Sequence, residues 1–263
     1  MGLTELFGAT ALMVAVCMLA LWLLSLALRN ASIVDVFWGL GFALIAGLTF
    51  LWTHDGSSAR RGLIAIMVGI WGLRLAGYLL WRNAGHGEDP RYAAMRRYWG
   101  NRFAWVSLFT VFTLQGVLMW TVALPIQLVM FAPGPGLGAL DALGLALWAA
   151  GLGFEAVGDW QITRFKADPA NRGRVMDRGL WRYTRHPNYF GDSCVWWGVF
   201  LVALSSPYGV WSAIGPALMS FLLMRVSGVP MLERSIHKRR PDYVAYAERT
   251  SAFFPRPPKP TGS

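Results

Sequence analysis

The sequence predicts an all-α integral membrane protein with about seven transmembrane helices, its N-terminus outside and its C-terminus in the cytoplasm. Three observations lead to this fold class: an apolar composition, long stretches without charge, and an uneven distribution of Lys and Arg. Of the 263 residues, 55% are hydrophobic and only 14% are charged, whereas charged residues make up about a quarter of an ordinary soluble domain. The predicted solvent for most of the chain is therefore a lipid bilayer.

Long stretches of the chain carry no charged side chain. The four main ones are Leu6–Leu28, Val36–His54, Phe103–Leu140 and Ser193–Met224. A helix needs roughly 20 apolar residues to cross a bilayer, and these runs are too long for the strands of a membrane barrel. Pro and Gly at 133–136 and the turn at 205–209 divide the two longest runs. The predicted spans are 4–28, 34–52, 62–82, 103–131, 137–158, 188–206 and 208–230.

The positions of Lys and Arg set the predicted orientation. With an outside N-terminus, 21 of the 24 Lys and Arg residues lie on the cytoplasmic side, as the positive-inside rule requires. Arg60 and Arg61 lie outside, and Arg74 lies within a span. Topology thus explains the net charge of +10, and because the basic residues are divided among loops we expect no nucleic-acid partner.

Polar residues inside the predicted spans are candidates for function because an ionisable group in lipid is costly. Asp35 opens the second span, and Trp38 lies on the same helical face. The carboxylate could cap the helix N-terminus, with Ser32 before it, or it could serve a ligand.

Arg74 and Tyr78 in the third span are four residues apart and share a face with Trp71. Arg74 could pair with a carboxylate such as Asp35 or Glu155. Alternatively, Tyr78 could donate a hydrogen bond in an aromatic-lined cavity.

Glu155 and Asp159 lie four residues apart at the cytoplasmic end of the fifth span, where two like charges repel each other. They could form ordinary ion pairs, or they could face donors such as ribose hydroxyl groups. We predict that the basic C-terminal tail, which includes Glu233 and Tyr243, contacts anionic lipid or covers a phosphate-bearing ligand.

The segment between the fifth and sixth spans suits a nucleotide. It contains seven basic side chains, which can bind phosphates, and Tyr183 and Tyr189, which can stack on a ring. Topology and lipid headgroups are alternative explanations for the same arginines. The chain has no Walker A sequence, no GxSxG elbow and no metal-ligand spacing, and His186 reads as a lone histidine.

Three stretches carry a resemblance to a known family: "GLWRYTRHPNYFGD" at 179–192, "DYVAYAERTSAFFP" at 242–255 and "SIVDVFWG" at 32–39. They resemble the steroid 5-alpha-reductase family, including a branch of bacterial membrane proteins. The core "RHPxYxG" is shared with sterol reductases and isoprenylcysteine carboxyl methyltransferases. The resemblance implies a multi-pass protein of the bacterial inner membrane that uses NADPH.

The same resemblance implies site residues. Asn188 and Asp192 match the asparagine and the acidic residue of the reductase motif, although steroid reductases more often have Glu at the latter position. Together with the residues named above, the predicted cofactor-binding set is Asp159, Arg164, Lys166, Arg172, Arg174, Tyr183, Asn188, Tyr189, Asp192, Glu233 and Tyr243. The family's reductases have a glutamate and a tyrosine near the substrate, and the matching positions here are Asp35 and Tyr78, which the resemblance implies are catalytic. Trp38, Trp71 and Arg74 would line the substrate cavity.

The resulting hypothesis is a monomeric reductase that transfers hydride from NADPH to the activated C=C bond of a hydrophobic enone such as a 3-oxo-Δ4 steroid. Protonated Asp35 and Tyr78 would stabilise the enolate. Within a single domain, spans one to four at 1–131 would form the substrate cavity, and residues 137–263 would bind the cofactor. The alternative is a methyltransferase of the isoprenylcysteine type that uses S-adenosylmethionine, which carries no phosphate to engage the arginine-rich segment.

Overall fold

The computed structural model describes residues 1–134, 136–237 and 242–259. These residues form helices joined by loops, with no strand among them, which confirms the predicted all-α class. Lys238, Arg239 and Arg240 of the basic tail lie outside the described residues.

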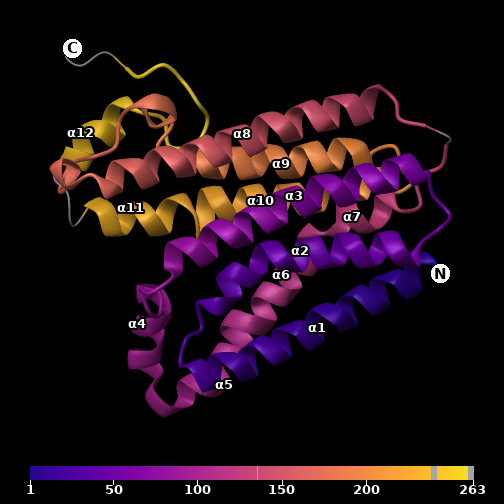
Figure 1. Cartoon of the computed structure of the whole chain (residues 1–263), viewed down its shortest axis with the longest axis horizontal. Coiled ribbons are helices and arrows are strands. Elements are labelled where there is room, and N and C mark those ends of the chain that lie inside the picture. The colour runs from indigo at the N-terminus through magenta and orange to yellow at the C-terminus, as the bar shows by residue number, and fades with distance from the viewer. Residues whose placement is uncertain (135, 238–241, 260–263) are drawn as a thin grey trace. The chain divides into compact units, whose positions relative to one another are not determined.

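The chain divides into two compact units. The first comprises Met1–Asp141 and Val202–Gly215, and α4 runs across the direction of α1, α2 and α3 (Figure 1). Its helices are α1 (Leu3–Leu28), α2 (Ile33–Trp52), α3 (Ser58–Asn83), α4 (Pro90–Trp99), η1 (Gly100–Arg102), α5 (Phe103–Ser107), the π-helical η2 (Leu108–Thr113), α6 (Leu114–Val122), α7 (Leu124–Val129) and η5 (Gly209–Ala213).

The second unit comprises Ala142–Leu201 and Pro216–Ser263. Its helices are α8 (Ala139–Ala167), η3 (Pro169–Asn171), η4 (Gly179–Arg182), α9 (Pro187–Ala203), α10 (Ile214–Phe221), the π-helical η6 (Leu222–Val226), α11 (Val229–His237) and α12 (Asp242–Arg249). The division concerns packing alone, so the assignment of substrate and cofactor regions to the two halves of the chain stays a prediction.

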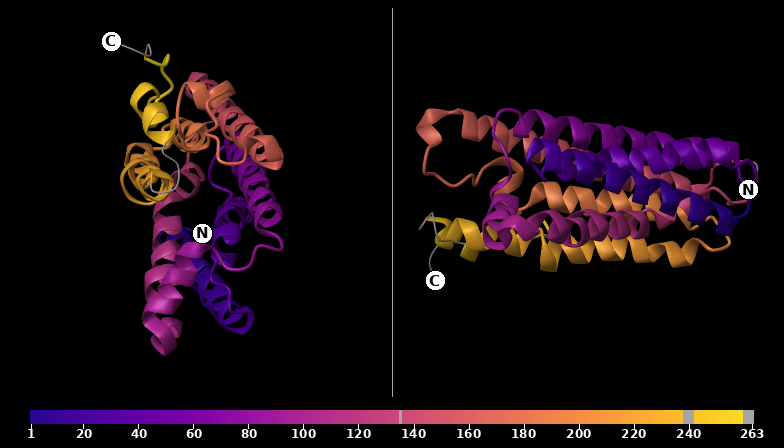
Figure 2. Two further views of the ribbon diagram at one scale, coloured as in Figure 1. Left: turned by 90° about the vertical axis from the view of Figure 1, so that its left-hand side faces the viewer. Right: turned by 90° about the horizontal axis from the view of Figure 1, so that it is seen from below.

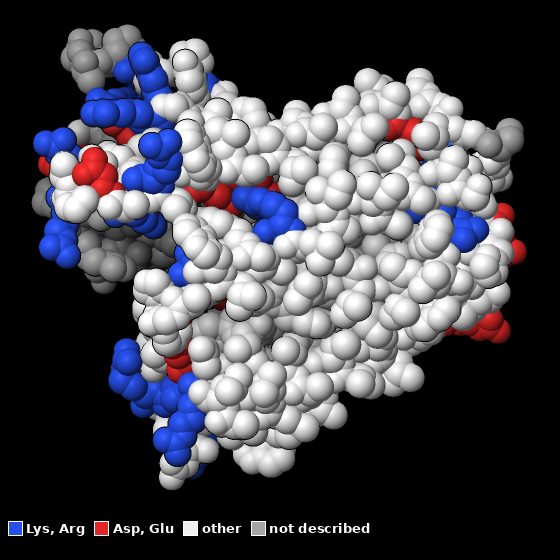
Figure 3. All heavy atoms as spheres, viewed as in Figure 1, with Lys and Arg blue, Asp and Glu red and all other residues white. Residues whose placement is uncertain are grey.

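Six stretches of the described chain are long and apolar enough to cross a membrane: Leu3–Leu28, Ile33–Trp52, Ser58–Asn83, Pro90–Val129, Ala139–Ala167 and Gly209–Glu233. Helix α9 has 17 residues and would extend about 25 Å. On the face shown in Figure 3, residues other than Lys, Arg, Asp and Glu cover most of the helical length, and many of the charged residues gather near helix ends. A multi-pass membrane protein accounts for this pattern.

In the first unit, α2 and α3 pack closely through glycine. A Cβ atom built on Gly39 would collide with the carbonyl oxygen of Gly72, and one built on Gly72 would collide with that of Gly39. The axes of α1, α2 and α3 lie roughly lengthwise in the right-hand view of Figure 2, and the chain direction of α2 is opposite to that of α1 and α3 (Figure 1). Small residues allow such close backbone approach in membranes, where van der Waals contact rather than the hydrophobic effect drives helix association.

In the second unit, α8 and α9 lie side by side (Figure 1) and approach most closely at Gly151 and Gly191. A Cβ atom on Gly191 would lie 2.5 Å from the carbonyl oxygen of Gly151 and 2.6 Å from the backbone nitrogen of Glu155. Both neighbours are backbone atoms, which cannot rotate away. This contact sets the spacing of the two helices that carry the candidate site.

Some predicted boundaries are wrong. The fifth span was expected to end at 158, but α8 continues to Ala167, so Arg164 and Lys166 lie on a helix rather than in a loop. The apolar stretch ends there, yet residues 159–168 contain no Gly or Pro that would end the helix before Pro169. The fourth span is divided into α5, η2, α6 and α7, and α4 precedes it with Asp89 as its N-cap and Pro90 in its first turn.

The close approach of α8 and α9 gives a direct test. We expect Gly191→Ala to destabilise the protein by about 1–3 kcal/mol or more, because the added methyl group overpacks a backbone contact. Gly153→Ala is the matched control, since a Cβ atom there has nothing within 4 Å. Unfolding in detergent measures both, and equal stability of the two variants would contradict the packing described here.

Candidate functional site

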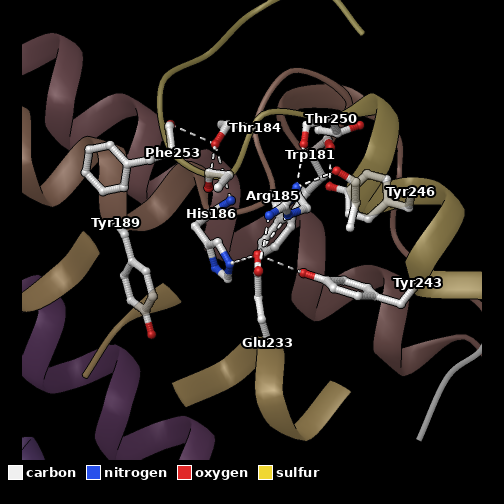
Figure 4. A network of polar contacts seen from close by, with 12 residues as sticks. Trp181, Thr184, Arg185, His186, Tyr189, Glu233, Tyr243, Tyr246, Thr250 and Phe253 are labelled. Carbon is white, nitrogen blue, oxygen red and sulfur yellow. Dashed lines mark hydrogen bonds and ion pairs between the residues drawn. The ribbon is translucent and has the colours of Figure 1, made fainter. Parts of the chain in front are cut away.

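Several of the residues that the sequence singled out in the second unit lie around the N-terminal turn of α9. The segment before α9, including η4, meets α11, α12 and the C-terminal residues 250–256 there (Figure 4). The short loop between η4 and α9 contains Thr184, Arg185 and His186, and Pro187 begins the helix.

Glu233 on α11 is the centre of this site. Its carboxylate accepts hydrogen bonds from the Nε and Nη2 atoms of Arg185, at 2.7 and 3.1 Å. The Nε2 atom of His186 donates to the same carboxylate at 3.1 Å, and the hydroxyl group of Tyr243 donates at 3.3 Å. The side chains are mostly buried, with 17% of Glu233, 11% of Arg185 and 3% of His186 exposed. One carboxylate thus joins α11, α12 and the turn before α9 (Figure 4).

Arg185 also holds the end of α12. Its Nη1 atom donates to the carbonyl oxygens of Ala247 and Thr250 at 2.7 and 2.6 Å. A guanidinium group is well placed there because the last carbonyl groups of a helix lack intrahelical partners and carry partial negative charge. The backbone nitrogen of Arg185 donates to Ser251, and the Thr184 hydroxyl group donates to the carbonyl oxygen of Phe253. The C-terminal segment is therefore fixed beside the turn.

Two tyrosines of α12 complete this group. Burial and the nearby Glu233 charge raise the pKa of Tyr243, and burial and the neighbouring Tyr243 raise the pKa of Tyr246. Both phenols therefore stay protonated and act as donors. Tyr243 donates to Glu233, and Tyr246 donates to the carbonyl oxygen of Trp181.

Asn188 and Asp159 form the second polar contact of the site. The Asn188 side-chain nitrogen donates to the Asp159 carboxylate at 3.2 Å, which links the first turn of α9 to α8. The Tyr189 ring stacks on His186 with a centroid distance of 5.4 Å. Asp192 lies one turn further along α9, on the same face as Asn188.

Several cations of this region face solvent. Arg164, Lys166, Arg172 and Arg174, all predicted to contact a cofactor, are exposed, as is Tyr183. The Arg164 guanidinium lies 5.2 Å from the centre of the Trp160 ring. The Lys166, Arg172 and Arg174 side chains can thus reach an anionic ligand with only partial loss of their hydration.

The arrangement suits a phosphate-bearing ligand better than a metal ion. Among the described residues, no group of three His, Cys, Asp or Glu side chains could hold a metal ion. The site offers exposed cations for phosphates, the Asn188–Asp159 pair for hydroxyl groups and Tyr183 for a ring. Glu233 and Tyr243, which the sequence predicted as cofactor contacts, bind each other, and Glu233 also binds Arg185. A contact of either residue with a cofactor stays a prediction.

The first unit contains its own polar group, around Asp35. The Arg91 Nη2 atom donates to one Asp35 oxygen at 2.7 Å, and the Tyr92 hydroxyl group donates to the other at 2.7 Å. Gln115 donates in turn to the Tyr92 oxygen at 3.1 Å. Both Asp35 carboxylate oxygens act as hydrogen-bond acceptors here. The predicted role as a neutral donor therefore requires Arg91 to move away.

The loop between α3 and α4 is fixed beside this group. Glu88 accepts hydrogen bonds from the backbone nitrogen of Ala31 and from Arg96, and the backbone nitrogen of Asp89 donates to Ser32. Burial by itself would raise the pKa of Glu88, but the hydrogen bonds from Arg96 and Ala31 hold it below its ordinary value. The loop is therefore held by charge-assisted hydrogen bonds at neutral pH.

The predicted substrate-side residues form two aromatic groups. Trp38, Phe42 and Trp71 lie in a row, with centroid distances of 5.3 and 5.6 Å. The Tyr78 ring lies 5.5 Å from the Arg74 guanidinium and 5.7 Å from that of Arg82. Asp35, which the sequence offered as a partner for Arg74, is paired with Arg91 instead.

The sequence reasoning missed four residues of these groups: Arg185, His186, Arg91 and Tyr92. The interpretation of His186 as a lone histidine is wrong, because it is buried against Glu233. Arg185 and His186 lie within the "RHPxYxG" core, so the motif itself marked them. Nothing in the spacing marked Tyr92, which is 57 residues from Asp35.

Comparison with known proteins gives a family but no activity. The family described as "Protein of unknown function (DUF1295)" matches residues 21–250, and this family lies within the steroid 5-alpha reductase-like superfamily. Uncharacterized protein C594.04c of Schizosaccharomyces pombe is 24% identical over 265 residues, which covers 90% of this chain and 76% of that protein. No solved structure matches the chain.

The central position of Glu233 can be tested by charge removal. Glu233→Gln leaves Arg185 largely buried without its counter-charge, which we expect to cost about 3–5 kcal/mol of unfolding free energy. Glu248→Gln on the exposed side of α12 is the matched control and should change stability by about 0.5 kcal/mol or less. Denaturant unfolding in detergent measures both, and a Glu233→Gln variant as stable as the control would show that the carboxylate does not organise the site.

Proposed function

The chain belongs to the DUF1295 family, and from this membership and the site in the second unit we propose that it is an NADPH-dependent membrane reductase. Its substrate would be a hydrophobic enone, such as a 3-oxo-Δ4 steroid, whose activated C=C bond is reduced. The observation that carries the proposal is the exposed cation group of Lys166, Arg172 and Arg174, in the same unit as the Asn188–Asp159 pair.

The donor set fits the parts of NADPH. NADPH carries three phosphate groups, and arginine binds phosphate through two parallel hydrogen bonds. Asn188 and Asp159 offer a donor and an acceptor for ribose hydroxyl groups, and Tyr183 offers an exposed ring. S-adenosylmethionine has no phosphate, so the cation group would have no counter-charge on that cofactor. The cation density therefore favours the dinucleotide.

The chain's own residues would hold and orient the reactants. The Glu233 group fixes the turn that carries Asn188, so the ribose contact is made by a side chain on a rigid element. When bound, NADPH supplies a hydride to the β-carbon of the enone and leaves as NADP⁺, while a proton completes the addition at the α-carbon. Donors near the carbonyl oxygen stabilise the developing enolate.

The candidates for that donor lie in the first unit. Tyr78 is a phenol donor, and Asp35 could donate only as a neutral acid. Both Asp35 oxygens already accept hydrogen bonds, from Arg91 and from Tyr92. We therefore propose Tyr78 as the main hydrogen-bond donor to the enolate oxygen, and we propose that Asp35 positions Arg91 and Tyr92.

The cofactor is tested by ligand-dependent thermal stability of the detergent-purified protein. We expect NADPH to stabilise it, by about 2.7 kcal/mol at a hundredfold excess over Kd, and S-adenosylmethionine to have no effect. Arg172→Gln with Arg174→Gln should weaken NADPH binding about tenfold or more, because charge-assisted hydrogen bonds are lost. Arg97→Gln, at an exposed arginine of α4, is the control. Stabilisation by S-adenosylmethionine alone would overturn the reductase proposal in favour of a methyltransferase.

The substrate side is tested by the rate of NADPH oxidation with 3-oxo-Δ4 steroids. Tyr78→Phe should slow reduction about a hundredfold, as loss of one enolate donor does, and Asp35→Asn should slow it as well. Both variants should keep the stabilisation by NADPH. Tyr98→Phe, at a tyrosine that is 80% exposed, serves as control. Full activity in both variants would remove Asp35 and Tyr78 from the mechanism.

A further inference from the structure

An open apolar hollow of about 260 Å³ lies on the outward face of α8 in the second unit. Ala150, Gly153, Phe154 and Val157 line it from α8, and Leu180 lines it from η4. The four α8 residues follow the spacing of one helical face. Ala150, Gly153 and Val157 are exposed, so the hollow is open to the surroundings of the helix, which in this part of the chain are lipid.

Toward the C-terminus of α8, the same face carries first an aromatic side chain with a polar group and then a cationic side chain. Trp160, which is 56% exposed, follows Val157 by three residues, and Arg164 follows by seven. The distance along the axis from Val157 to Arg164 is about 10 Å. Trp is enriched at the membrane–water boundary, so this order of side chains places the hollow in the hydrocarbon region and Arg164 at headgroup level.

The other wall of the hollow is fixed rather than mobile. The backbone nitrogen of Leu180 donates to the Gln161 side chain at 3.0 Å, and the Trp181 indole nitrogen donates to the carbonyl oxygen of Gly158 at 3.1 Å. Gly179 has a φ of 58°, and any Cβ atom there would collide with Gln161. These contacts hold η4 against α8, and Arg178 and Arg182, both exposed, flank Leu180 in the sequence.

The exposed charge that α8 carries beyond the hollow is cationic, at Arg164 and Lys166, whereas the nearby carboxylates of the helix are buried. The two carboxylates in the C-terminal half of α8, Glu155 and Asp159, are 3% and 5% exposed, and Asp159 accepts a hydrogen bond from Asn188. Three exposed arginines therefore stand beside an apolar hollow at the predicted depth of the headgroups. That combination is complementary to a molecule with an acyl chain and a phosphate.

We propose that the hollow binds an acyl chain of an anionic phospholipid, whose phosphate is held by Arg164, Arg178 and Arg182. The proposal is independent of the reductase proposal, because Arg178 and Arg182 have no part in the predicted cofactor site. Arg164, which the sequence predicted as a cofactor contact, is assigned to the lipid in this proposal. The position of Arg164 beside Trp160, on the outward face of α8, supports this assignment.

The apolar part is tested by filling the hollow. Gly153→Leu adds a side chain where a Cβ atom meets nothing within 4 Å, so it blocks the acyl chain without straining the fold, and Leu is the better helix former. Gly47→Leu makes the same change at an exposed glycine of α2 that also has nothing within 4 Å. The probe is phosphatidylglycerol added to the detergent-purified protein, with bound lipid counted by native mass spectrometry and stability followed by thermal unfolding.

Phosphatidylglycerol should stay bound to the wild type and to the Gly47→Leu variant, and it should raise the melting temperature of both. The Gly153→Leu variant should neither retain the lipid nor be stabilised by it. Retention by Gly153→Leu equal to that of the wild type would overturn the proposal. Phosphatidylcholine with the same chains should bind more weakly, and equal binding of the two lipids would overturn the role of the arginines.

The charged part is tested by Arg178→Gln with Arg182→Gln. Each cation contributes about 1 kcal/mol near an anionic lipid, so affinity for phosphatidylglycerol should fall about fivefold for each arginine removed, and the stabilisation by NADPH should remain. An unchanged lipid affinity would contradict the assignment. Glycerol 3-phosphate, the headgroup chemistry without chains, should not stabilise the protein; if it did so through the same arginines, the site would be a simple anion site and the lipid proposal would fall.

Discussion

The site in the second unit depends on one carboxylate. Glu233 accepts hydrogen bonds from Arg185 and His186, which lie 48 and 47 residues before it, and from Tyr243, which lies 10 residues after it. A largely buried carboxylate is costly unless donors satisfy it, so its presence on α11 requires that the turn before α9 and the first turn of α12 lie against it. Because Arg185 extends the group to the carbonyl oxygens of Ala247 and Thr250, the C-terminal segment is held by the same centre.

This arrangement separates two kinds of arginine that the sequence does not distinguish. The Arg185 side chain is largely buried and donates hydrogen bonds to Glu233 and to backbone carbonyl groups. Arg172, Arg178 and Arg182, in contrast, are exposed. The positive-inside rule predicts only the side of the membrane on which all four lie. The structural arginine fixes the turn, and the exposed ones are available for anions. A rigid support beneath exposed cations is what a preorganised binding site requires.

The helices could be predicted from the sequence because each is encoded by an uninterrupted run of local residues. Charge-free stretches located α1, α2 and α9 within a few residues, and the Pro and Gly residues at 133–136 separated α7 from α8. Helix α4 was missed because its charged residues resemble a loop, and the end of α8 was missed because hydropathy marks the edge of the membrane rather than the end of a helix.

The candidate site was harder to predict because its contacts join distant residues. Glu233 and Tyr243 were named from composition, but their partner Arg185 could not be identified without the fold, and the Asp35–Tyr92 contact spans 57 residues. Motif resemblance singled out Asn188 and Asp192 within "RHPNYFGD" as cofactor contacts but gave no part to Arg185 or His186. The structure assigns Arg185 and His186 to the support and leaves Asn188, beside Asp159, as a polar contact at the start of α9.

The central claim is that the second unit binds a dinucleotide on the support that Glu233 organises. Hydrogen–deuterium exchange of the detergent-purified protein with and without saturating NADPH tests it most directly. Dinucleotide binding at this place should slow amide exchange in residues 164–192 and 242–254 and leave exchange in α4, at 90–99, unchanged. Unchanged exchange in 164–192 at a concentration of NADPH that saturates binding would contradict it.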